Sequence, residues 1–132
     1  MSESRVKASL APLLAQLPRS PSDRWPAGEP FVRALAHGSM SVELFAPNEL
    51  DRQKPHAQDE LYFIQRGNAT LTIEAVAHSC ASGDVFFVAA GQDHRFTDFS
   101  HDFATWVVFW GPQGGEQSRG IEPHMLLNED PR

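Results

Sequence analysis

Hydrophobic and polar residues alternate along much of the middle of the chain. In residues 69–76, Leu71 and Ile73 alternate with threonine and glutamate side chains, which is the pattern of a strand with one buried face. Other short runs rich in β-branched or aromatic residues are separated by turn-forming residues, so they are also predicted to be strands. The predicted strands cover residues 31–37, 39–45, 61–64, 69–76, 84–89, 94–99 and 103–110, and residues 75–82 are predicted to be a connection. This succession predicts an all-β fold, a single antiparallel jelly-roll barrel.

Residues 54–67 fit two local structures when taken alone. His56 and Glu60 are four positions apart, so they would share a face of a helix and equally a face of a strand. The aromatic and β-branched residues 61–64 favour the strand. Residues 66–68 are Arg-Gly-Asn, which is turn chemistry, and we therefore predict a β-hairpin with residues 69–76.

The two ends of the chain have a different character. Apolar residues in segment 5–17 recur at helical spacing and predict a short amphipathic helix; they are Val6, Leu10, Leu13, Leu14 and Leu17. Proline-rich residues 18–30 form a linker in which Trp25 is expected to contact the barrel. We therefore divide the chain into a helical arm and linker at 1–29, a barrel at 30–112, and a tail at 113–132.

Composition narrows the classes of function. The 132 residues carry a formal net charge of −6, so nucleic acid is not an expected partner. Cys80 is the one cysteine, which excludes an intrachain disulfide and fits the cytoplasm. The sequence shows neither a signal peptide nor an apolar stretch of about 18 residues, so no membrane role is expected.

Three side chains stand out as candidate metal ligands. His56, Glu60 and His94 lie on two strand-like segments, and two imidazoles with one carboxylate suit iron, manganese, nickel or zinc while leaving positions open. We expect one divalent ion per chain. Gln58 shares the strand face of His56 and Glu60, so its amide oxygen is either a fourth ligand or an outer neighbour. Asp98 follows His94 on the same predicted face and is the expected acceptor that orients its ring.

The first of these segments resembles the first motif of the cupin superfamily. That motif has a histidine, one residue, a second histidine, three or four residues, a glutamate, six residues and a glycine. Here His56, Glu60 and Gly67 occupy the last three of these positions. Lys54 stands where the family has its first histidine, which is a departure from the pattern.

The second segment is similar to the second cupin motif. Gly83, Gly91 and His94 fall on the expected positions, whereas Ala89 replaces the usual proline and Asp98 the usual asparagine. The gap of fifteen residues between the motifs, 68–82, is typical of small bacterial cupins. The resemblance extends over residues 30–112 and implies a double-stranded β-helix, the cupin barrel.

This resemblance implies a range of activities rather than one. The leading hypothesis is a metal-dependent dioxygenase acting on a small organic molecule. A second is a metal-dependent isomerase or epimerase in which Tyr62 or Lys54 moves protons. The third is a non-catalytic module in which Lys54, His56 and Glu60 surround a small-molecule ligand.

Two further expectations concern Lys54 and assembly. The Lys54 ammonium can turn outward, pair with Glu60, or face the cavity and hold an anionic substrate. The apolar helix and the two-faced strand 103–110 carry more apolar surface than one small barrel buries. Small cupins also commonly pair, so we expect a homodimer.

Overall fold

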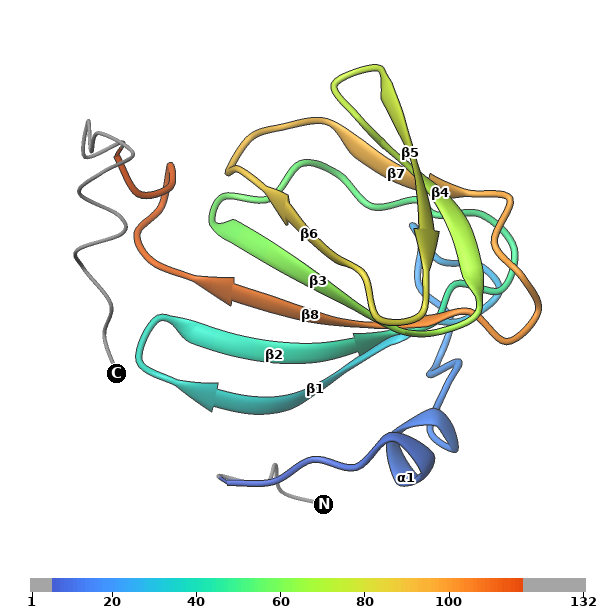
Figure 1. The fold of residues 1–132 in the computed structure, drawn as a ribbon. Coiled ribbons are helices and arrows are strands. Elements are labelled where there is room, and N and C mark those ends of the chain that lie inside the picture. Colours follow the sequence, from blue (N-terminus) through green and yellow to red (C-terminus); the bar gives the residue numbers. More distant parts are fainter. Residues whose placement is uncertain (1–5, 118–132) are drawn as a thin grey trace.

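The computed structural model describes residues 6–117, and within them eight strands and one short helix (Figure 1). The helix is α1 (Leu10–Leu14), and the strands are β1 (Phe31–His37), β2 (Met40–Phe45), β3 (Asp59–Arg66), β4 (Asn68–Ile73), β5 (Val76–Ala81), β6 (Val85–Val88), β7 (His94–Thr97) and β8 (Ala104–Trp110). The predicted all-β class and the N-terminal helical arm are confirmed.

The strands form two facing sheets, and every pairing is antiparallel. One sheet has five strands in the order β1-β2-β8-β3-β6, and the other has three in the order β5-β4-β7. Neighbours in both sheets come from distant parts of the chain, as in a jelly roll. The two halves of the predicted metal motif therefore lie on different sheets, with Glu60 on β3 and His94 on β7.

The core lies between the sheets because alternate residues of each strand point inward. Tyr62, Leu71 and Phe96 are fully buried there, and the rings of Tyr62 and Phe96 meet edge to face with centroids 4.9 Å apart. Trp25 is also buried in this core, so the proline-rich linker contacts the barrel as predicted.

The N-terminal helix is shorter than the helical spacing predicted. It runs only from Leu10 to Leu14, and the Ser9 side chain makes no capping hydrogen bond. Proline at position 18 disfavours helical backbone at the residue before it. The leucines of this arm pack on the outer face of the five-stranded sheet, against Val32, Leu44 and Ala104.

The strand β5 was not predicted, because its sequence lacks regular alternation. It lies at an edge of the three-stranded sheet and exposes most of its residues. The turn that leads into it places Glu74 and Ala75 at φ values of 46° and 68°. Two consecutive positive φ values are those of a type I′ hairpin turn, which normally contains asparagine and glycine. A Glu-Ala turn gives no such signal in the sequence.

The start of the predicted tail folds back on the barrel. The backbone N–H of Glu116 donates to Asp59 Oδ2 at 2.8 Å, so residues 111–117 cover the beginning of β3. The rest of the tail, 118–132, lies outside the described residues. No helix in the described part of the chain is long and apolar enough to cross a membrane.

Candidate metal centre

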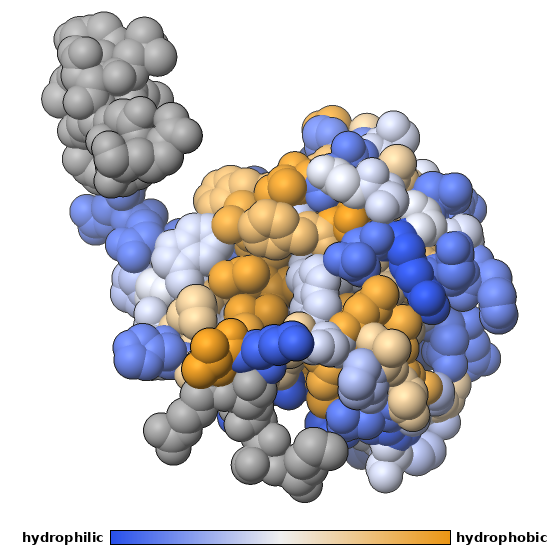
Figure 2. Space-filling view, turned by 60° about the horizontal axis from the view of Figure 1, so that its bottom comes forward, coloured by the Kyte–Doolittle hydropathy of each residue, from blue (hydrophilic) through white to orange (hydrophobic). Residues whose placement is uncertain are grey.

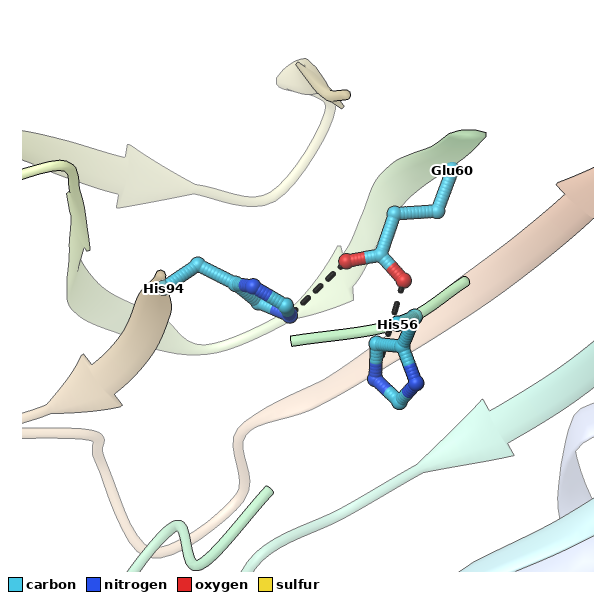
Figure 3. Close-up of side chains that lie close together, drawn as sticks. All are labelled: His56, Glu60 and His94. Carbon is cyan, nitrogen blue, oxygen red and sulfur yellow. Dashed lines mark ion pairs between the residues drawn. The ribbon is translucent and has the colours of Figure 1, made fainter. Parts of the chain in front are cut away.

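Three side chains from three separate segments converge between the sheets (Figure 3). His56 belongs to the loop before β3, Glu60 is the second residue of β3, and His94 is the first residue of β7. One potential ligand atom from each residue lies within 4.8 Å of those of the other two. The predicted trio therefore comes together, although its members are up to 38 positions apart in the sequence.

Backbone contacts hold the two halves of this cluster together. The N–H of Gly91, in the turn before His94, donates to the carbonyl oxygen of His56 at 2.8 Å. In the same turn, the N–H of Ala90 donates to Asp59 Oδ1 at 2.9 Å. The turn leading to His94 is thus fixed to the loop carrying His56 by one main-chain hydrogen bond and to the start of β3 by the Asp59 side chain.

The tautomer of His94 follows from its surroundings. Its Nδ1 lies 2.9 Å from the carbonyl oxygen of Gln92. A carbonyl oxygen can only accept, so Nδ1 carries the hydrogen and Nε2 of the neutral ring has a bare lone pair. This Nε2 lies 2.8 Å from Glu60 Oε1, and both side chains are almost completely buried.

That short contact requires a cation or a proton. Both oxygens of Glu60 and Nε2 of His94 are buried without a hydrogen-bond partner, because two lone-pair atoms face each other. Burial acts to lower the pKa of His94, but the Glu60 carboxylate and the Gln92 carbonyl outweigh it, so the pKa is raised. Two atoms that bind one metal at right angles, with bonds of about 2.1 Å, lie about 3.0 Å apart. The pair therefore fits a divalent ion.

His56 occupies the more accessible side of the cluster. Its Nε2 lies 3.8 Å from Glu60 Oε2, and its side chain is 33% exposed against 1% for Glu60. Desolvation lowers the pKa of His56, and the nearby Glu60 carboxylate only partly offsets this. The neutral imidazole, which is the form that binds metal, is thereby favoured.

Two residues of the site were missed in the sequence. Gln53 Oε1 lies 3.0 Å from His56 Nε2 and accepts a hydrogen bond from the Tyr62 hydroxyl at 3.2 Å. Gln53 Nε2 donates to Asp51 Oδ2 at 2.7 Å, and Asp51 is only 4% exposed. Both lie in a loop outside the recognised motifs, and a buried aspartate in a polar loop gives no periodic signal.

The other predicted residues do not join the trio, although the ring centroid of Tyr62 lies 6.1 Å from that of His94. Lys54 is exposed, in agreement with the outward alternative. The Gln58 amide donates to the carbonyl oxygens of Ser39 and Gly111, both at 2.9 Å, so it links the ends of strands. Tyr62 is fully buried, and burial raises its pKa well above the usual value.

Asp98 does not take the role expected of it. It lies just past the end of β7, is exposed, and has a φ of 51°, whereas the predicted strand continued to residue 99. The ring of His94 is oriented instead by the main-chain carbonyl of Gln92. Cys80 is also outside the cluster, and burial raises its pKa to about 11.

A cavity of about 320 Å³ opens beside His56. Its apolar walls are mainly aromatic and come from Trp25, Phe31, Phe45 and Phe109, with Ala57 and Val107 beside them. The ring of Phe109 packs against His56 with centroids 4.9 Å apart.

Two charged side chains also line this cavity, Arg24 and Glu43. Burial raises the pKa of the Glu43 carboxyl, while Arg33 acts in the opposite direction. The sequence contained a signal for Glu43. It lies two positions from both Ser41 and Phe45, so all three side chains share the inward face of β2. The cavity thus combines aromatic walls, one cation and one carboxyl next to the candidate ligands.

Comparison with known sequences gives a family match and a relative. The profile of the family described as Cupin domain matches residues 41–110, from β2 to the end of β8. An uncharacterized protein of Streptomyces coelicolor, SCO3923, is 40% identical over 85 residues, which are 63% of this chain and 81% of the relative.

Solved structures of similar shape support the same architecture. A cupin 2 conserved barrel domain protein from Salinispora arenicola has a TM-score of 0.53 at 16% identity, covering 61% of this chain and 74% of its own. KdgF from Halomonas sp. has a TM-score of 0.56 at 13% identity, covering 63% and 78%. At these identities the likeness establishes the fold and leaves the activity to be argued from the site.

Proposed function

This chain belongs to the cupin family, and on that premise we propose that it is a metal-dependent dioxygenase acting on a small organic molecule. His56, Glu60 and His94 would hold one divalent ion. A bound iron or manganese ion supplies Lewis acidity and one-electron chemistry toward dioxygen. The chain's own residues would hold the metal ion, bind the substrate in the cavity and exclude water.

The observation that carries the proposal is the meeting of His94 Nε2 and Glu60 Oε1 at 2.8 Å with no hydrogen bond to satisfy either atom. Buried polar atoms are normally hydrogen-bonded, and exceptions call for an explanation. A divalent cation between the two side chains provides one, and in the metal-free protein a proton on His94 Nε2 takes its place. Three protein ligands also leave further positions open, as a catalytic rather than a structural metal site requires.

The cavity supports a substrate of limited size with an apolar body. A volume of about 320 Å³ lies at the lower end of the range for small-molecule sites. Aromatic walls favour a flat or unsaturated molecule, and the Arg24 guanidinium at the same cavity favours a carboxylate or another anionic group.

A second candidate function is favoured by Glu43. An isomerase or epimerase needs a side chain that exchanges protons with the substrate. Lys54 and Tyr62 were predicted for this role, but neither is among the residues that line the cavity. The half-buried Glu43 does line it, and its raised pKa suits proton transfer nearer to neutral pH.

The deciding experiment begins with metal content. We expect near-stoichiometric metal in protein purified without an affinity tag, or after reconstitution with iron, manganese, nickel or zinc. His94→Ala should lose this metal, because it removes one of three ligands, whereas His101→Ala at an exposed position should keep it. Equal metal in the two variants, or none in wild type, would overturn the metalloenzyme hypothesis and favour the binding module.

Oxygen uptake then separates the two enzymatic candidates. The reconstituted protein is given a panel of small aromatic and unsaturated carboxylic acids in an oxygen electrode. If the protein consumes oxygen and Glu43→Gln leaves this consumption largely intact, the dioxygenase is supported. Conversion of a panel member without oxygen uptake, lost in Glu43→Gln, supports the isomerase instead.

A further inference from the structure

Gln53 lies where the cluster lacks a ligand. The family pattern has a histidine at the position of Lys54, but the Lys54 side chain is exposed. The neighbouring Gln53 is partly buried and brings its amide oxygen to 3.0 Å from His56 Nε2. A side chain one position earlier thus lies beside the candidate ligands.

The orientation of the Gln53 amide is fixed by Asp51. Asp51 Oδ2 accepts hydrogen bonds from Gln53 Nε2 at 2.7 Å and from the Phe96 backbone N–H at 2.8 Å. Its Oδ1 accepts from the Gln53 backbone N–H at 3.1 Å. Burial raises the pKa of Asp51, but the backbone N–H groups of Gln53 and Phe96, one on each carboxyl oxygen, require acceptors there. The amide nitrogen must therefore face Asp51, and the amide oxygen faces His56.

The amide oxygen has lone pairs for two partners. The Tyr62 hydroxyl donates to it at 3.2 Å, which leaves one lone pair directed at the cluster. In the metal-free protein His56 Nε2–H donates to this lone pair. When a cation binds, the His56 proton moves to Nδ1, and Nε2 and the amide oxygen are then bare side by side. Their separation of 3.0 Å is close to that of two ligands on one metal, about 3.0 Å.

We propose that Gln53 supplies a fourth ligand to the divalent ion through Oε1, held in place by Asp51. This inference rests on the metal site of the proposed function but not on its chemistry. The ligand set becomes two imidazoles, one carboxylate and one amide oxygen. Because carbonyl and carboxylate oxygens suit manganese better than zinc, this set moves selectivity toward manganese compared with three imidazoles.

The test compares two glutamines of the same cavity. Gln53→Met and Gln58→Met both replace an amide with an unbranched apolar chain of similar length. Gln58 is the residue that strand geometry placed beside His56 and Glu60, as either a fourth ligand or an outer neighbour. We measure the dissociation constants of Mn²⁺ and Zn²⁺ by competition with a chelator. Gln53→Met should weaken Mn²⁺ binding by about 10- to 100-fold, the range seen when a supporting residue is lost, and should weaken Zn²⁺ binding less. Gln58→Met should leave both constants within about threefold.

A measurement on the bound ion distinguishes a role of Gln53 as a metal ligand from a merely structural role. Water-proton relaxation of the Mn²⁺-loaded protein should show one more coordinated water in Gln53→Met than in Gln58→Met, because water takes the position that the amide oxygen leaves. Asp51→Asn allows the Gln53 side-chain amide to rotate by half a turn, so this variant should also bind Mn²⁺ more weakly.

The outcomes that overturn the inference are distinct. Unchanged Mn²⁺ affinity in Gln53→Met, an unchanged number of coordinated waters, or equal losses of affinity in the two methionine variants would each overturn it. Wild type that binds no divalent metal overturns this inference and the proposed function together. Metal binding without oxygen uptake overturns only the dioxygenase.

Discussion

His94 is held in one tautomer by a main-chain carbonyl, and this decides how the site responds to pH. Its raised pKa in the metal-free protein means that a proton occupies the ligand nitrogen at pH values above the ordinary 6.5. His56, whose pKa is lowered by burial, is deprotonated first as pH rises. The last proton that a metal must displace is therefore that of His94.

Metal affinity and metal-free stability should consequently change in opposite directions with pH. Divalent-metal affinity should rise until pH exceeds the raised pKa of His94, because the proton and the metal compete for Nε2. In metal-free protein the protonated His94 pairs with Glu60. That stabilisation is fully present below the unfolded pKa and is lost as pH rises through the folded one.

Chelator competition measures the trend in metal affinity, and thermal unfolding of the metal-free protein measures the trend in stability. Both are followed from about pH 5.5 to about pH 8.5, around the imidazole pKa. His94→Ala removes the His94 contribution and should flatten the stability trend, whereas His101→Ala should not. Parallel trends in wild type would contradict this account of the His94–Glu60 contact.

At the residue scale, the residue spacing of the two cupin motifs was enough to predict the trio of candidate metal ligands. Strand alternation was expected to place His56 and Glu60 on one face, whereas His56 lies in the loop before β3. The glycines of both motifs mark the turns around them. Gln53 and Asp51 were not predictable in this way, because their roles depend on how an irregular loop folds. The Gln92 carbonyl was equally hidden, since every residue has a main-chain carbonyl and the sequence does not say where it points.

At the scale of elements, Asp59 joins three parts of the chain. Alternation along β3 turns it away from Glu60 and predicts an exposed side chain, yet it is only 5% exposed. Its carboxylate accepts from Ala90 in the turn before β7 and from Glu116 beyond β8. The alternation of residues along a strand does not show that a segment beyond the last strand will return and cover Asp59. The exposed edge strand β5 escaped prediction for a related reason, since it has little buried face.

Asp59→Ala should lower the free energy of unfolding by about 2 to 4 kcal/mol, because two backbone N–H groups lose a charged acceptor. Metal affinity should fall with it, as the turn before His94 loses an anchor. The exposed Asp93 in the same turn provides the control, and Asp93→Ala should change the unfolding free energy by less than about 0.5 kcal/mol. Urea denaturation of both metal-free variants measures the difference. Equal stabilities would show that Asp59 does not anchor these segments.

At the scale of the whole molecule, the five-stranded sheet presents apolar side chains outward as well as inward. Figure 2 shows apolar side chains gathered across the middle of the face that carries α1 and the first strands. Phe63, Val85 and Phe87, on neighbouring strands of the same sheet, are 39%, 53% and 53% exposed. The helix covers only the part around Val32 and Leu44, so the sheet, more than the helix, motivates the predicted homodimer.

We expect a sedimentation mass near twice the 14.7 kDa of the chain at micromolar concentration. Pairing of identical sheet faces about a two-fold axis would cover these side chains. Phe87→Lys should shift the protein to monomer, because each copy would place a charge in the interface. Val76→Lys, at a position 57% exposed on the other sheet, should leave the mass unchanged. A wild-type mass near that of one chain would refute the dimer.

The unequal burial of the three candidate ligands has a kinetic consequence. His56 is 33% exposed, whereas Glu60 and His94 are each about 1% exposed, so an incoming ion meets His56 first and the buried pair last. His56 then governs the association rate, and the buried pair governs the residence time. In stopped-flow measurements, His56→Ala should mainly slow metal uptake and His94→Ala should mainly speed release. Equal effects on both rates would mean that the ion arrives by another route.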